Sequence, residues 1–243
     1  MKRETTNHIR FVLEELLPPA LRDSALMRWL FRRHCGSLID ELEQFRTNAH
    51  HISDEDYARI YAALPRVHQG TDNSAECIRK IIAATLPGDV LDVGCGTGYL
   101  LSAIDDALGR KERNYTGLDF QVDDETRDNL PNIRFEESIV ERLPYADNSF
   151  DTLICTHLLE HILDIRTCVS ELRRVCRKRL IIVVPQEREY KFTFNPHLHF
   201  FPYRHSFLKF MLPVPANASC ENIGRDFFYM EDYPDETNSP RRD

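Results

Sequence analysis

One crowded stretch of glycine constrains this chain more than any other feature of its sequence. Three of the nine glycines, Gly94, Gly96 and Gly98, fall within five positions. They follow residues 90–93, an apolar run that predicts a buried strand, and they precede a predicted helix. A strand, a glycine-rich turn and a helix N-terminus let a ligand approach backbone N–H groups. We therefore expect a binding site at this turn.

The sequence around the turn predicts an α/β fold. From residue 89 onward, short apolar segments that predict strands alternate with helical stretches. This alternation indicates a doubly wound, mostly parallel sheet with helices on both faces. The predicted strands are residues 90–93, 115–119, 133–135, 151–155 and 180–184, and helices are predicted around residues 165–175 and 207–211.

The first third of the chain has a different texture. Apolar residues recur at helical spacing in residues 11–16 and 26–45. A capped, acidic start predicts a further helix over residues 53–64, and residues 73–76 have capping-box spacing before another one. We expect a helical N-terminal extension or cap in residues 1–77, the α/β domain in residues 78–231 and a flexible tail in residues 232–243.

Charge and cysteine content limit the classes of function. The 31 Lys and Arg against 39 Asp and Glu give a net charge of −8, which does not favour a large nucleic-acid or anionic-membrane footprint. We interpret the one basic run, residues 173–179, as a solvated helix end. Seven cysteines without a CxxC pair favour reduced thiols, and no apolar run approaches the ~20 residues that span a bilayer. We expect a cytoplasmic protein without a membrane span.

Two common nucleotide-binding interpretations of the glycine turn fail on neighbouring residues. A dinucleotide fingerprint needs Gly or Ala directly after Gly98, where this chain has Tyr99. A P-loop needs Gly-Lys followed by Ser or Thr, which does not occur. Asp119, at the end of the second predicted strand, is placed to accept hydrogen bonds from ribose hydroxyls. The pattern favours a nucleoside ligand without a diphosphate.

Four sequence blocks follow one another between residues 91 and 162. They are LDVGCGTG at 91–98, GLD at 117–119, LPYADNSFD at 143–151 and LEHI at 159–162. In this order and spacing they resemble the class I S-adenosylmethionine-dependent methyltransferase family, specifically its small-molecule group. The resemblance covers roughly residues 78–185. It implies a Rossmann-like, seven-stranded sheet, S-adenosylmethionine as the cofactor and S-adenosylhomocysteine as the product.

The resemblance also implies roles for the residues that match the first two blocks. Gly94, Cys95 and Gly96 would pass under the methionine part of the cofactor, and Asp92 would organise the turn. Asp119 would hold the ribose.

Residues after the second and third strands would complete the cofactor site. Phe120 would lie against the adenine. Many relatives carry an Asp where this chain has Ile139, so we expect the backbone of Ile139 to meet the adenine edge, with Ser138 as polar help. Thr156 would lie where the cofactor and acceptor pockets meet.

Histidines are the candidate catalytic residues, because an imidazole titrates near neutral pH and suits proton removal from a hydroxyl. The candidates are His157, His161, His197 and His199. A structural role stays open for His161, because relatives with very different acceptors carry the same Leu-Glu-His run. No metal site is expected, since no carboxylate of obvious spacing accompanies the His-x-His pair.

The predicted function is methyl transfer from S-adenosylmethionine to a small molecule, with oxygen as the acceptor atom. The resemblance suggests a sugar, a glycan precursor or a natural product. The alternatives are N-methylation of a small amine and, from a different class, an inactive cofactor-binding partner subunit. The sequence shows no evident groove for a protein or RNA substrate, so no nucleic-acid partner is expected. A homodimer is compatible with the sequence.

Overall fold

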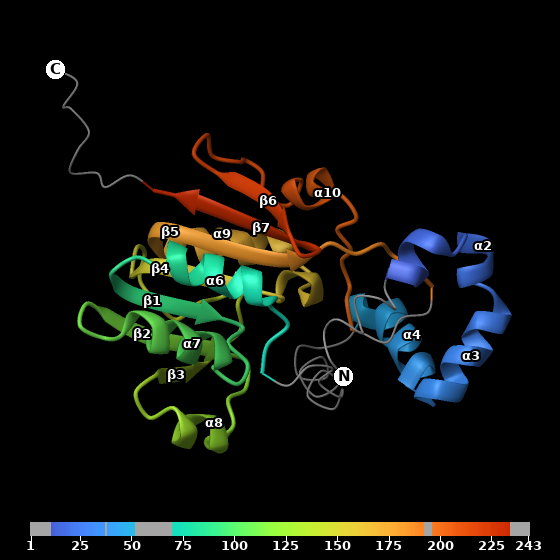
Figure 1. The fold of residues 1–243 in the computed structure, drawn as a ribbon, viewed down its shortest axis with the longest axis horizontal. Coiled ribbons are helices and arrows are strands. Elements are labelled where there is room, and N and C mark those ends of the chain that lie inside the picture. The colour runs from blue at the N-terminus through green and yellow to red at the C-terminus, as the bar shows by residue number, and fades with distance from the viewer. Residues whose placement is uncertain (1–10, 37, 52–69, 192–195, 234–243) are drawn as a thin grey trace. The chain divides into compact units, whose positions relative to one another are not determined.

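The computed structural model describes residues 11–36, 38–51, 70–191 and 196–233 (Figure 1). The chain divides into two compact units. The helical unit consists of Met1–Gln69, Glu160–Leu163 and Gln186–Pro202, and the sheet unit consists of Gly70–Leu159, Asp164–Pro185 and Tyr203–Asp243. Two short segments from the second half of the chain thus belong to the helical unit. The boundaries expected from the sequence, 1–77, 78–231 and 232–243, stay predictions.

The sheet unit is built on seven strands in the order β3-β2-β1-β4-β5-β7-β6 (Figure 1). Neighbours among β1 to β5 pair in parallel, whereas β7 pairs antiparallel with both β5 and β6. This confirms the Rossmann-like, mostly parallel, seven-stranded sheet. The strands are β1 (Gly88–Val93), β2 (Arg113–Asp119), β3 (Arg134–Glu137), β4 (Phe150–Thr156), β5 (Cys176–Pro185), β6 (Ser219–Ile223) and β7 (Asp226–Asp232).

Helices cover both faces of this sheet. On one face, residues of α6 and α7 share a buried core with β1, β2 and β5. On the other, α9 buries Ile165, Cys168, Val169, Leu172 and Val175, which follow the helical period along a single stripe. Figure 1 shows α6 in front of the sheet and α9 behind it. The helices are α6 (Ala75–Ala84), α7 (Tyr99–Leu108), α8 (Asp124–Asn129), α9 (Ile165–Val175) and α10 (Arg204–Leu208), with the short η3 (Leu159–His161) after β4.

The hairpin β6–β7 has no counterpart among the strands predicted from the sequence, which are the first five strands of the sheet. Its strands close on the pair Ile223 and Asp226, so Gly224 and Arg225 form a two-residue turn. Both turn residues have positive φ, 56° and 71°. This geometry is typical of hairpin turns rich in Asn-Gly or Asp-Gly. Gly-Arg gives a much weaker sequence signal for the same turn.

The helical unit contains η1 (Val12–Leu16), α2 (Pro19–Arg22), α3 (Ala25–Cys35), α4 (Leu38–Asn48) and η2 (Ala49–His51). Ser24 caps α3, accepting a hydrogen bond from the Met27 N–H, and α4 buries Ile39, Leu42 and Phe45. Helices are therefore found where residues 11–16 and 26–45 predict them. The helix expected over residues 53–64 lies outside the described residues. Among the described helices, none combines the length and apolar character needed to cross a bilayer.

One segment of the helical unit comes from beyond β5. Arg46 on α4 donates a hydrogen bond to the Tyr190 carbonyl at 3.0 Å, and its guanidinium lies 4.8 Å from the centre of the Phe200 ring. Tyr190 and Phe201 are both buried. Residues 186–191 and 196–202 are thus packed as part of the helical unit.

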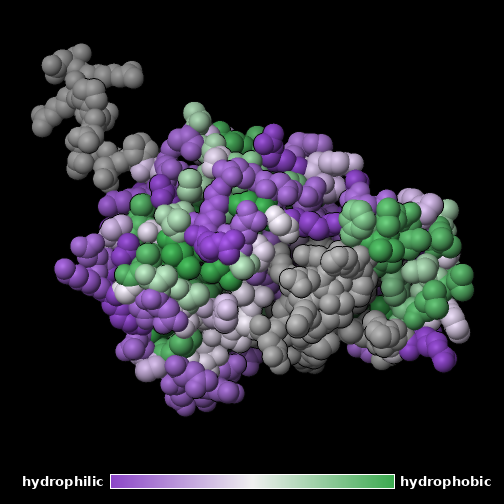
Figure 2. All heavy atoms as spheres, viewed as in Figure 1, coloured by the Kyte–Doolittle hydropathy of each residue, from purple (hydrophilic) through white to green (hydrophobic). Residues whose placement is uncertain are grey.

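Large apolar side chains are exposed on the first helices of the helical unit. Figure 2 shows them as a green area over α2 and α3. The residues, each more than two fifths exposed, are Phe11, Val12, Leu16, Leu21, Leu26, Trp29 and Leu30.

The basic run at residues 173–179 is not a solvated helix end. Helix α9 ends at Val175, and β5 begins at Cys176, so the last three cations lie on a strand. Each cation is paired with a carboxylate of the sheet unit: Arg173 with Glu231, Arg174 with Glu171 and Asp147, Arg177 and Lys178 with Asp151, and Arg179 with Asp232. Internal pairing therefore accounts for this positive charge without a nucleic acid.

Candidate functional site

The glycine turn lies between β1 and α7, at the carboxyl edge of the sheet. Gly94, Gly96 and Gly98 all have positive φ, which is costly for residues with a Cβ. The N–H groups of Gly94 and Cys95 both donate to the Leu118 carbonyl, at 2.7 and 3.1 Å. The turn is thereby held to the end of the neighbouring strand β2.

Neighbouring side chains leave no room for a Cβ at Gly98 and only a tight fit for one at Gly94. A Cβ on Gly98 would lie 2.7 Å from Phe135 Cζ and 2.8 Å from Leu130 Cδ1. A Cβ on Gly94 would lie 3.1 Å from the Leu158 side chain. Glycine is therefore required at the turn for close packing as well as for backbone conformation. The contact at Gly94 also brings residues 157–158, just after β4, against the turn.

Asp119 connects the turn to the end of β2. Its Oδ2 accepts a hydrogen bond from the Gly96 N–H and its Oδ1 accepts one from the Phe120 N–H, both at 2.8 Å. The Ser138 N–H donates to the Asp119 carbonyl at 2.9 Å.

Asp92, near the end of β1, is a buried carboxyl beside the turn. It is 2% exposed, and burial together with the negative charge of Asp119 raises its pKa to about 7. Among the described residues, its Oδ1 has no hydrogen-bond partner. An acid in this state fits a cationic ligand, because a positive charge nearby would offset the cost of ionising it. S-adenosylmethionine carries such charge on its ammonium and sulfonium groups.

Cys95 lies inside the turn with its thiol buried. It is 7% exposed. Burial, together with the negative charges of Asp92 and Asp119, raises the pKa of the thiol well above its usual range.

The residues expected around the adenine follow β2 and β3. Phe120 is half-buried and Ile139 is 48% exposed. The Ser138 hydroxyl lies within 3.5 Å of the carbonyls of Ile139 and Arg142.

Asn73 is a site residue that sequence reasoning missed. Its Nδ2 donates to the Thr156 hydroxyl at the end of β4, at 2.8 Å. Its Oδ1 is buried and has no hydrogen-bond partner among the described residues. The sequence predicts only that Asn73 belongs to a helix start. In the structure, Ser74 is the residue that caps this helix, α6. No local signal distinguishes an Asn before a cap from one that reaches a strand end.

His157 lies directly after β4. It has a positive φ of 51°, and its N–H donates to the Val183 carbonyl at 2.9 Å. A residue with a Cβ seldom adopts this conformation, although His does so more readily than most. Such backbone strain occurs preferentially at functional sites.

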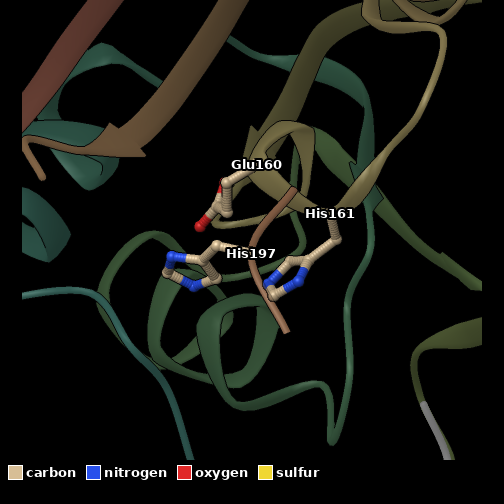
Figure 3. Close-up of side chains that lie close together, drawn as sticks. All are labelled: Glu160, His161 and His197. Carbon is tan, nitrogen blue, oxygen red and sulfur yellow. The ribbon is translucent and has the colours of Figure 1, made fainter. Parts of the chain in front are cut away.

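His161 and His197 lie together in the helical unit, with Glu160 beside them (Figure 3). The two ring centroids are 4.8 Å apart and the ring planes are nearly perpendicular. His197 Nδ1 lies 2.6 Å from Glu187 Oε2, and His161 Nδ1 lies 3.4 Å from the Pro196 carbonyl oxygen. The fold thus supplies carboxylates that the spacing along the chain did not reveal.

His199 has different surroundings from His197. Its ring is half-buried beside the backbone of Ile162 and Leu163. Burial lowers its pKa below the ordinary value, with a further contribution from nearby His50. The two histidines of the His-x-His pair therefore do not share one set of partners.

Taken by unit, the site residues expected from the sequence fall into two groups. The first group lies at the carboxyl edge of the sheet unit, which brings together the turn, the end of β2, the start of the loop after β3 and the end of β4. The residues of this group are Asp92, Gly94, Cys95, Gly96, Asp119, Phe120, Ser138, Ile139, Thr156 and His157. His161, His197 and His199 belong to the helical unit.

Comparison with known proteins identifies a family that this part of the chain resembles. Residues 91–184 match a family model described as a methyltransferase domain. The match begins within β1 and runs through most of β5, so it includes the glycine turn and Asp119.

Parts of the chain are also similar to curated relatives. A demethylmenaquinone methyltransferase of Staphylococcus epidermidis is 31% identical over 130 residues, 51% of this chain and 51% of the relative. A ubiquinone biosynthesis O-methyltransferase of Paracidovorax citrulli is 35% identical over 96 residues, 36% of this chain and 39% of the relative. The chain spans about a third to a half of the length of the curated relatives it matches.

Solved structures support the fold. A SAM-dependent methyltransferase from Aquifex aeolicus superposes with a TM-score of 0.50 and 18% sequence identity, over 64% of this chain and 89% of that one.

Proposed function

From the match of residues 91–184 to a methyltransferase domain and the geometry of the turn, we propose that the chain is a class I S-adenosylmethionine-dependent methyltransferase that transfers the methyl group to a hydroxyl of a small molecule. The observation that carries the cofactor assignment is the Asp119 carboxylate, bonded to the Gly96 N–H of the glycine turn at 2.8 Å. It joins a carboxylate suited to ribose hydroxyls with a turn suited to close backbone approach.

The cofactor supplies a methyl group already activated by its sulfonium, so the chain mainly binds and aligns the reactants. In the proposed site, Asp119 accepts hydrogen bonds from the ribose hydroxyls. Asp92 holds the negative charge that a cationic ligand requires. Thr156, anchored by Asn73, lies at the end of β4 and would bound the space for the acceptor.

We assign the general base to His157. The neighbouring Leu158 side chain lies against Gly94, which keeps this segment beside the turn within the sheet unit. An imidazole nitrogen of His157 would take the hydroxyl proton as the new O–C bond forms and the C–S bond breaks. We assign no catalytic role to His161, His197 or His199, the other candidates from the sequence, and His199→Asn below tests this for His199.

The observations that favour a class of acceptor are less specific than those that favour the cofactor. The relatives named for demethylmenaquinone and for ubiquinone biosynthesis favour a small-molecule acceptor, and the second is named as an O-methyltransferase. A sugar, glycan precursor or natural product stays the prediction for the acceptor itself.

Calorimetry with S-adenosylhomocysteine tests the cofactor site. Hydrogen bonds to a charged group contribute about 1.5–3 kcal/mol each, so Asp119→Ala should weaken binding by on the order of 100-fold or more. Asp124→Ala, an exposed acid on α8, is the matched control and should bind as the parent does. No binding by the parent would refute the enzyme assignment and leave at most an inactive partner subunit.

A mass-spectrometric screen of metabolite extract tests the reaction. A product heavier by one methylene, dependent on both protein and S-adenosylmethionine, identifies the acceptor. His157→Asn should then lower the rate most at the pH where the parent is fastest, whereas His199→Asn should change it little. A methylated amine as product, or an unchanged pH profile in His157→Asn, would overturn the oxygen assignment while leaving methyl transfer intact.

A further inference from the structure

Four side chains that the proposed methyl transfer does not use lie together in the helical unit. They are Glu160, His161, Glu187 and His197, which we call the His–Glu cluster. We propose that this cluster binds a divalent transition-metal cation, with Glu160, His161 and His197 as the ligands and Glu187 as the residue that orients His197. The inference is independent of the methyltransferase assignment.

The spacing of the three ligands is close to that of a metal site. One ligand atom each from Glu160, His161 and His197 lies within 4.8 Å of the other two. Bonds of about 2.1 Å place ligand atoms about 3–4 Å apart, so small side-chain rotations would complete the site. Figure 3 shows the two imidazole rings side by side with the Glu160 carboxylate next to them.

The hydrogen bonds of the two imidazoles define which ring nitrogen is available. His161 Nδ1 lies 3.4 Å from the Pro196 carbonyl oxygen, which can only accept, so this contact favours the tautomer with the proton on Nδ1. His197 Nδ1 faces Glu187 Oε2 at 2.6 Å, which favours the same tautomer. Both rings therefore present the lone pair on Nε2. Metal-binding histidines are held in this way, with the other nitrogen donating to a carboxylate or a backbone carbonyl.

Backbone hydrogen bonds hold the two ligand-bearing segments together. The N–H groups of Leu198 and His199 both donate to the Glu160 carbonyl, at 2.8 and 3.0 Å. The backbone that carries Glu160 and His161 is thus fixed to the backbone that carries His197. A site held in this way loses less entropy when a ligand orders it.

Burial of charge also favours a cation. Glu160 and Glu187 are each 1% exposed or less, and His161 is 7% exposed. Buried carboxylates are costly unless positive charge lies close to them. A divalent cation would supply that charge, and protonated imidazoles are the competing source. A metal and a proton compete for the same Nε2 lone pairs, so metal binding would release protons.

The donor set indicates the kind of metal. Two imidazoles and one carboxylate suit Zn²⁺, Mn²⁺ or Fe²⁺, whereas Mg²⁺ and Ca²⁺ prefer oxygen ligands throughout. We therefore expect Zn²⁺ and Mn²⁺ to bind, with Zn²⁺ tighter.

The test is a titration of the untagged full chain after treatment with a chelator. Calorimetry and elemental analysis should give one equivalent of Zn²⁺ per chain, and Mg²⁺ should not compete. Glu160→Gln should weaken Zn²⁺ binding by more than about 100-fold, and Glu187→Gln by about 10–100-fold because it loses only the orienting contact. His205→Asn is the matched control, since its ring stacks on Tyr203 in the sheet unit.

Circular dichroism and Co²⁺ absorption complete the test. Glu187→Gln keeps all three ligands, so it should fold as the parent does even if Glu160→Gln does not. Co²⁺ should give visible bands of nitrogen and oxygen ligands without a thiolate charge-transfer band. Absence of Zn²⁺ and Mn²⁺ binding by the parent, equal binding by Glu187→Gln and His205→Asn, or a thiolate band would each overturn the proposal. None of these results would alter the outcome with S-adenosylhomocysteine.

Discussion

The glycine turn of the sheet unit and the His–Glu cluster of the helical unit present two different ways to build a site. The turn is made largely of backbone, and Asp119, the last residue of β2, accepts a hydrogen bond from its Gly96 N–H. The cluster is made of side chains from separate stretches of chain, Glu160 and His161 after β4 and Glu187 and His197 after β5. Ligand binding at a site built from backbone should be lost when a methyl group is added to it. Ligand binding at a site built from side chains should be lost when a functional group is removed.

The largest expected effect is that of an added methyl group in the turn. Gly98→Ala combines a left-handed backbone, φ 69°, with a Cβ 2.7 Å from Phe135 Cζ. We expect the free energy of unfolding to fall by about 2–5 kcal/mol, and S-adenosylhomocysteine binding to be lost. Gly109→Ala is the control for backbone strain without crowding, because it has φ 68° and ψ −175° but nothing within 4 Å of its Cβ, and it should cost about 1–3 kcal/mol. Urea denaturation measures both, and equal losses would show that packing does not constrain the turn.

The next largest expected effect is an increase in the free energy of unfolding rather than a decrease. The pKa of Asp92 is raised from 3.8 to about 7, so this carboxyl favours folding at low pH and loses that contribution as pH rises through about 7. Asp92→Asn should therefore raise the free energy of unfolding at pH 8, by up to about 4 kcal/mol, and change it little at pH 4. Binding of S-adenosylmethionine should weaken in the same variant. Exposed Asp106→Asn should change neither property, and a loss of stability at pH 8 in Asp92→Asn would contradict the buried-charge account.

A third effect is a pH dependence of cofactor affinity. A cation favours the ionised form of Asp92, so affinity for S-adenosylmethionine should rise with pH up to about 7 and level off above it. The expected difference between pH 6 and pH 8 is about tenfold. Calorimetry at a series of pH values measures it. The dependence should vanish in Asp92→Asn, and its persistence there would assign the titration to another group.

The smallest expected effect comes from the one cofactor position that departs from many relatives. Ile139→Asp places a carboxylate where an adenine amino group could donate to it, at an exposed position that tolerates the change. A single such hydrogen bond contributes about 1 kcal/mol, so affinity for S-adenosylhomocysteine should rise about three- to tenfold. Ile139→Asn separates the hydrogen bond from the added charge. Weaker binding in both variants would show that the apolar side chain itself contacts the adenine.

The comparison also explains what the sequence could predict. The turn and the first five strands carry local signals, namely glycine spacing, apolar runs and acids at strand ends, so their place could be predicted directly. The hairpin β6–β7 was missed because Gly224-Arg225 is a weak turn signal. Glu160 and Glu187 were missed as partners of the histidines because their proximity depends on tertiary structure. Asn73 was missed for the same reason, since only the fold brings it to Thr156.

The burial of Cys95 has a chemical consequence for a protein that handles an alkylating reagent. A thiolate beside a sulfonium would itself be a methyl acceptor, whereas a neutral thiol is a poor nucleophile. Burial and the nearby negative charges raise the pKa of Cys95, so the sulfur stays protonated at physiological pH. The same buried acids that favour a cationic ligand thus also keep this thiol a poor nucleophile.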